Sequence, residues 1–128
     1  MPQARSARGK LRQVERWLWQ EYTPLFPVRV VFRPKVSQNS QDFATTRRIK
    51  SQFYVSIWTG LLVWPAVATR FLLHEAAHVL SWQIHREDDF TEHDHPPEWG
   101  IWMARLETDF YDGTGFDDAC ELSPRPWT

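Results

Sequence analysis

The stretch Leu72-Leu73-His74-Glu75-Ala76-Ala77-His78 decides how this chain is interpreted. Its two histidines are four residues apart, so on a helix of ~3.6 residues per turn both imidazoles point to the same side. Such a pair can hold a metal ion, and Glu75, rotated by about a hundred degrees, lies beside the ion as the expected general base. The pattern predicts a zinc-dependent hydrolase with His74 and His78 as metal ligands.

The sequence around the pentad His74-Glu75-Ala76-Ala77-His78 predicts a helix that is apolar on nearly every face. Pro65 suits the first turn of the helix, which we expect to run to about Ile84. Such a helix belongs at the centre of a domain, where unpartnered His and Glu side chains are costly. A bound metal ion would supply the partner.

Shorter patterns predict the other elements of an α+β domain. Apolar residues at helical spacing indicate an N-terminal helix: Leu11, Val14, Leu18 and Tyr22. Three strands are expected at 28–33, 43–50 and 53–58, the last two antiparallel to each other, in a short antiparallel or mixed sheet. A second, supporting helix begins at Pro96-Pro97 and ends between Asp112 and Gly115.

At 128 residues the chain is expected to form one domain. We divide it into a flexible basic arm (1–8), a core (9–112) and an acidic, proline-containing tail (113–128). The uncharged run 53–69 is too short for a membrane span and contains Gly60 and Pro65, so it predicts a buried strand followed by a buried helix. The lone Cys120 and the absence of a secretory leader pattern favour the cytoplasm.

Charge is distributed unevenly along the chain. Residues 1–50 hold 11 Lys/Arg and 3 acidic residues, whereas residues 51–128 hold 4 Lys/Arg and 13 acidic residues. A solvated basic face is the simpler interpretation, and contact with nucleic-acid phosphates is the competing one. The candidate contacts are Arg5, Arg8, Arg12, Arg16, Arg47 and Arg48, with Arg29, Arg33 and Lys50 extending the patch.

A catalytic zinc site needs a third protein ligand, and the residues leave several candidates. His85 lies on the same helical stripe but about 10 Å further along, too far for direct ligation. Glu98 on the second helix would complete a site of two histidines and one glutamate. His93 and His95 precede that helix, after a loop long enough to return the chain to the ion.

Two separated motifs, the pentad and His95-Pro96-Pro97-Glu98-Trp99, resemble the SprT-like (Spartan-related) zinc metalloprotease family, and the Tyr54-Val55-Ser56-Ile57 strand fits the same pattern. The resemblance spans roughly 53–106. It implies a small zincin-like domain of minigluzincin type, in which His95 completes a three-histidine site with His74 and His78. Glu98 and Trp99 would then pack the second helix. Since Cys120 cannot form the Cys-rich zinc ribbon of many bacterial relatives, the resemblance implies a minimal catalytic core.

The mechanism that follows is peptide-bond hydrolysis. Zinc would lower the pKa of its water toward about 7, and Glu75 would take the proton. We expect 53–58 to be an exposed edge strand that binds the substrate backbone by strand addition. The alternatives are a peptidase with His74, His78 and Glu98 as ligands, and a non-enzymatic interaction protein, such as a phage or mobile-element accessory, that keeps the zincin scaffold.

Overall fold

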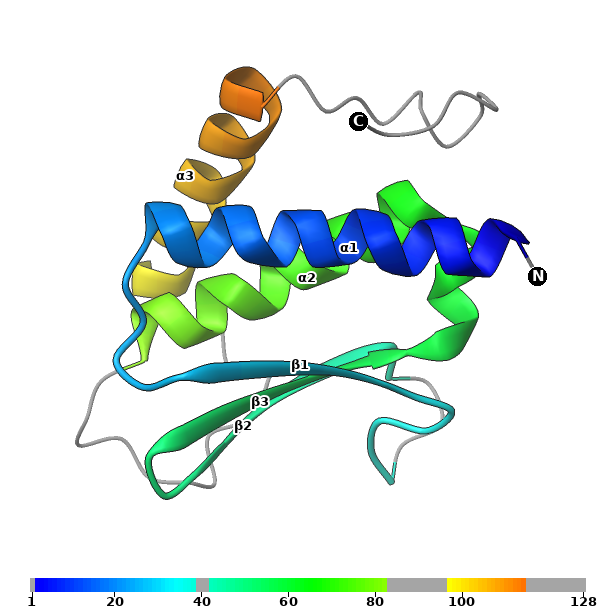
Figure 1. The fold of residues 1–128 in the computed structure, drawn as a ribbon. Coiled ribbons are helices and arrows are strands. Elements are labelled where there is room, and N and C mark those ends of the chain that lie inside the picture. The colour runs from blue at the N-terminus through cyan, green and yellow to red at the C-terminus, as the bar shows by residue number, and fades with distance from the viewer. Residues whose placement is uncertain (1, 39–41, 83–96, 115–128) are drawn as a thin grey trace.

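In the part of the chain that the structure describes, three α-helices lie on one side of a three-stranded sheet (Figure 1). The computed structural model describes residues 2–38, 42–82 and 97–114, the side chains of 2–6 and 114 excepted. The elements in chain order are α1 (Pro2–Glu21), β1 (Val28–Arg33), β2 (Ala44–Ile49), β3 (Gln52–Trp58), a 3-10 helix η1 (Thr59–Val63), α2 (Pro65–Ser81) and α3 (Pro97–Thr114). This confirms the expected α+β class, and of the two expected sheet types it shows the mixed one.

The strands pair in the order β1-β3-β2. β2 and β3 form the expected antiparallel hairpin, whose turn places Lys50 at a φ of 56°, and β1 runs parallel to β3. The prediction that 53–58 is an edge strand is therefore wrong. β3 carries the most apolar inward residues, with Phe53, Val55 and Ile57 all fully buried, and the central position removes both of its edges from solvent.

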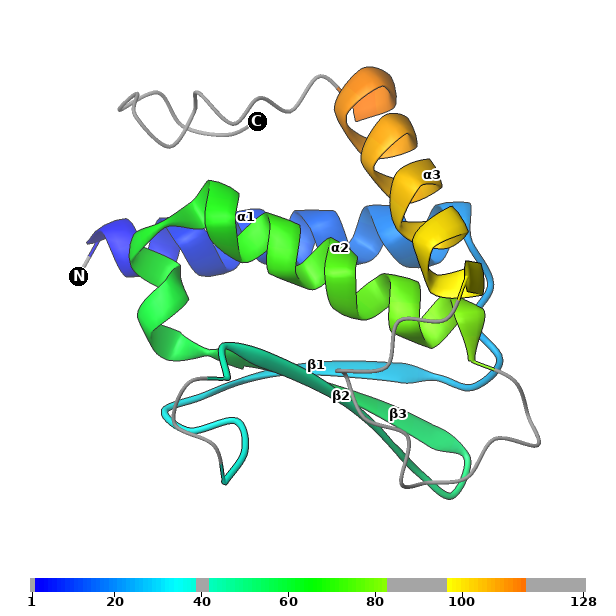
Figure 2. The ribbon, with the colours of Figure 1, turned by 180° about the vertical axis from the view of Figure 1, so that it is seen from behind.

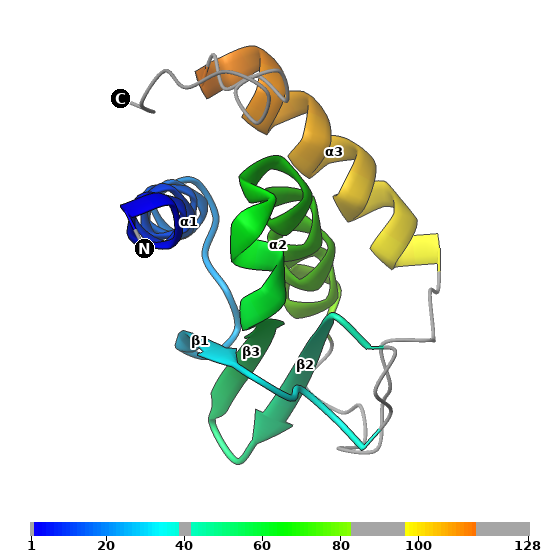
Figure 3. The ribbon, with the colours of Figure 1, turned by 90° about the vertical axis from the view of Figure 1, so that its right-hand side faces the viewer.

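Helix α2 is the centre of the structure, as its sequence predicts. It lies on the sheet between α1 and α3 (Figures 2 and 3). Twelve of its residues are buried, among them Leu72, Leu73, Ala76 and Ala77. The helix ends at Ser81, a little before the expected end at Ile84. Apolar contacts on several sides therefore fix the helix that carries the pentad.

The uncharged run 53–69 splits into β3, η1 and the first turn of α2. A side chain at position 60 would displace the exposed ring of Trp58, because a Cβ atom on Gly60 would lie against that ring. No helix among the described residues is long and apolar enough to cross a membrane.

The first helix begins earlier than expected. Residues 1–8 are expected to be a flexible arm, but α1 starts at Pro2 and Ala7 is fully buried. A proline in the first turn followed by alanines and arginines favours helix even without a long apolar repeat. The predicted core positions Leu11, Val14, Leu18 and Tyr22 are all buried.

Aromatic rings join α1 to α3. The Trp17 ring contacts Tyr22 and Phe110 edge to face, with centroids 5.8 and 5.3 Å apart, and Tyr22 contacts Trp102 in the same way at 5.7 Å. The Tyr22 hydroxyl also donates a hydrogen bond to the Asp109 carboxylate. These contacts hold α3 against the rest of the core. They thereby position the residues of α3 that face α2.

We predict that Tyr22→Phe costs about 1–2 kcal/mol of unfolding free energy at neutral pH, because Asp109 loses its donor. Burial and the neighbouring carboxylate raise the pKa of Tyr22 from 10.0 to about 12 in the folded protein. The neutral phenol therefore stabilises the fold below pH 10, and this contribution is lost as the pH rises toward 12. Urea unfolding across this pH range measures it: Tyr22→Phe should lose less stability than wild type, and identical pH profiles would contradict the assignment.

Candidate metal centre

His74 and His78 occupy successive turns of α2, with their ring centroids 5.1 Å apart. His78 is fully buried, whereas the side chain of His74 keeps 28% of its surface exposed. The structure thus brings the two predicted ligands together at the border between the core and solvent. This is the position that a metal site open to a substrate needs.

The carboxylate of Glu75 is buried, with 1% of the residue exposed. Thr46 on β2 donates a hydrogen bond from Oγ1 to Glu75 Oε1 at 2.5 Å. The other oxygen, Oε2, lies 3.9 Å from His74 Nε2. One oxygen is therefore held by the sheet while the other lies near His74, as the predicted general base requires.

Sequence reasoning did not identify Thr46. A buried Glu75 does require a hydrogen-bond donor, but four polar residues of the second strand could supply one, and the inward face of that strand is visible only from its pairing. Thr46 pairs with Val55, whose side chain is fully buried, so both point toward the helices.

Trp99 fixes the histidine pair from the side of α3. Its ring centroid lies 4.8 Å from that of His74 and 5.6 Å from that of His78. Its indole Nε1–H donates to the carbonyl oxygen of His74 at 3.2 Å. Packing of the second helix was the role expected of Trp99, and the structure adds direct contact with both candidate ligands.

The third ligand is not placed. His85, His93 and His95 all lie outside the described residues, as does Cys120. Glu98 is described, at the start of α3, but no three His, Cys, Asp or Glu side chains within 2–38, 42–82 and 97–114 form a group able to hold a metal ion. The structure therefore does not join Glu98 to His74 and His78.

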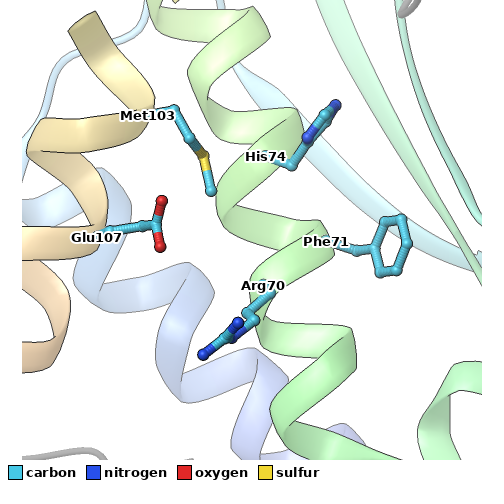
Figure 4. Close-up of a pocket in the computed structure, with 5 residues that line it drawn as sticks. All are labelled: Arg70, Phe71, His74, Met103 and Glu107. Carbon is cyan, nitrogen blue, oxygen red and sulfur yellow. The ribbon is translucent and has the colours of Figure 1, made fainter. Parts of the chain in front are cut away.

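An open groove of about 280 Å³ begins at His74 and runs between α2 and α3. Met103 and Glu107 extend from α3 toward α2, which contributes Arg70, Phe71 and His74 (Figure 4). Its lining joins apolar surface to charged groups. The groove therefore places apolar and charged side chains next to His74.

The arginines of the predicted basic patch fall into separate groups. Arg8 and Arg12 of α1 lie over the ring of Phe32, at 4.9 and 5.0 Å, and Arg12 also donates to the Val30 carbonyl oxygen at 3.1 Å. Arg48 lies over Phe26 at 5.9 Å and donates to Lys50. Arg16 and Arg47 are exposed. The side chain of Arg5 lies outside the described part.

The chain matches no protein-family model, and comparison with curated proteins and with solved structures found no match. The relation to the SprT-like family therefore stays a prediction from the two motifs.

We predict that Thr46→Val costs about 2 kcal/mol of unfolding free energy, because Glu75 Oε1 loses its donor in a buried place. Thr46→Ser, which keeps the hydroxyl, should cost about half as much. Thr45→Val is the matched control, since Thr45 is equally buried but donates only a long 3.4 Å bond to the Val36 carbonyl oxygen. Chemical denaturation measures all three, and equal losses for Thr46→Val and Thr45→Val would contradict the role of Thr46.

Proposed function

We propose that the chain is a zinc-dependent metallopeptidase of SprT-like type that hydrolyses protein substrates. One observation carries the proposal: a buried His-Glu-x-x-His helix in which Glu75 is held by Thr46 while its second oxygen faces His74. A buried carboxylate is costly in a purely structural helix, so its placement beside two imidazoles favours a chemical role.

The donor set fits a zinc ion. His74 and His78 supply two imidazoles one turn apart, and His95 is the third ligand that the motif resemblance implies. Bound zinc would supply a water of lowered pKa and polarise a substrate carbonyl.

The chain's own residues would do the remaining work. Glu75 would accept a proton at Oε2, the oxygen that Thr46 does not hold, and return it to the leaving amine. Thr46 and Trp99 act as positioning residues: the first fixes the carboxylate, the second packs on both imidazoles.

We propose that the substrate backbone binds along β2 instead of β3. One edge of β2 pairs with β3, and no other described strand pairs with the second edge of β2. Thr46 connects this strand directly to Glu75, so a peptide added along β2 would pass beside the candidate base. The groove at His74 would receive one of its side chains.

We expect the purified chain to bind one zinc ion, and His78→Ala and His95→Ala to lose it. Glu98→Ala is the matched control and should keep the metal. Elemental analysis after gel filtration measures the zinc content, and circular dichroism checks the fold. If Glu98→Ala loses zinc and His95→Ala keeps it, the site consists of two histidines and one glutamate instead; if all three keep it, the zinc site is not the one proposed.

Glu75→Gln should keep zinc and lower the rate of casein or self-cleavage by about 100- to 10,000-fold, because the general base is lost. Glu98→Gln should cleave at the wild-type rate, and a chelator should stop cleavage in both active proteins. Undiminished cleavage by Glu75→Gln would contradict its role. A wild-type protein that binds zinc yet cleaves nothing would favour the non-enzymatic scaffold.

A further inference from the structure

An apolar surface lies at the end of the sheet where β3 leads into η1. The ring of Phe43, just before β2, contacts that of Trp58 at the end of β3, with centroids 5.6 Å apart. Phe43 also contacts Phe71 of α2 edge to face, again at 5.6 Å. Phe43, Trp58 and Phe71 form the aromatic cluster. Because Phe43 and Trp58 are both exposed, the cluster is an outward-facing surface and not part of the core.

The apolar surface continues along η1 and the first turn of α2. Val63 and Trp64 are more than half exposed, and Val67 is exposed as well. Val67 and Phe71 are four residues apart on α2 and therefore lie on one face of the helix. Residues 53–69, from which most of this surface comes, contain no charged side chain. Adjoining exposed apolar residues of this kind mark a binding surface for an apolar ligand.

The aromatic cluster leads directly to the candidate metal centre. Phe71 lines the groove that begins at His74, and both side chains extend from the same side of α2 (Figure 4). The two residues are three positions apart, which is about 4.5 Å along the axis of a helix that rises ~1.5 Å per residue. The cluster is thus displaced from the histidine pair by about one helix turn.

Strand β2 gives a displacement in the same direction. Thr46, which holds Glu75, is three residues from Phe43, or about 10 Å of extended chain at ~3.3 Å per residue. A polypeptide bound along the open edge of β2 would advance by the same ~3.3 Å per residue. When its scissile bond lies beside Glu75, a side chain about three residues from that bond therefore lies at the aromatic cluster.

We propose that the aromatic cluster is a subsite for a bulky apolar side chain of the substrate, about three residues from the cleaved bond. The inference rests on the proposed peptidase activity and on peptide binding along β2. The preferred substrates are then polypeptides with an aromatic or large aliphatic residue at that distance. Such a side chain would lie against Phe43 and Trp58, and its burial would strengthen substrate binding. An acidic side chain there would lose hydration without gaining a partner among these rings.

A peptide series tests the proposal on the full chain. A casein-derived peptide is varied between Phe and Ala, one position at a time, and mass spectrometry identifies the cleaved bond. About three residues from that bond, kcat/KM should be about 10- to 100-fold higher for Phe than for Ala, the effect of burying one such side chain. The preference should occur on one side of the bond and not at the same distance on the other, because the cluster lies at only one end of β2.

Binding of the same labelled peptides to Glu75→Gln is a second readout, which does not require cleavage. Fluorescence anisotropy should show the same preference for Phe, and Phe43→Thr and Trp58→Thr should abolish most of it in both assays. Ile49→Thr is the matched control and should keep the preference. Ile49 is three residues from Thr46 in the opposite direction and is 47% exposed, against 41% for Phe43. Circular dichroism checks that each variant is folded.

The outcomes separate the subsite from the peptidase activity. Cleavage without a preference for Phe at this distance would overturn the subsite and leave the activity standing. A preference for Phe at one position in binding, without any cleavage, would support the subsite and contradict the activity. Absence of both binding and cleavage would overturn both. Equal losses in Ile49→Thr and in the two cluster variants would overturn the subsite. So would a wild-type dimer in light scattering that becomes a monomer in Trp58→Thr, which would assign the surface to a second copy.

Discussion

The hydrogen bond from Thr46 to the buried carboxylate of Glu75 constrains more of this molecule than its own strand and helix. A strand alternates its side chains, so turning Thr46 toward α2 turns Thr45 and Arg47 away from it. Because strands pair in register, the same choice sets the outward direction of Tyr54 and Arg29. A slip of one residue would expose the apolar residues of β3 and leave Glu75 without this donor. One contact thus sets which residues of the sheet face the candidate base and which face away from the helices.

Aromatic packing gives the histidine pair its rigidity. Trp99 touches both imidazole rings and bonds the backbone of the same helix turn, while Trp17, Tyr22 and Phe110 hold α3 against α1. Rings lose few rotatable bonds when ordered, so such contacts position neighbours at a small entropic cost. The high aromatic share of the sequence therefore matters most where three helices must keep two side chains in place.

Periodic patterns in the sequence allow much of the fold and of the candidate site to be predicted. The helical face with Leu11, Val14, Leu18 and Tyr22 is buried, as its spacing predicts. The pentad likewise predicts that His74 and His78 lie together with Glu75 beside them. Strand order could not be predicted, since alternation in β3 reveals an inward face but not which strands lie beside it. For the same reason the sequence alone does not identify Thr46 as the partner of Glu75. The start of α1 was misjudged because Ala7 packs tightly without the bulk that marks a core position in sequence.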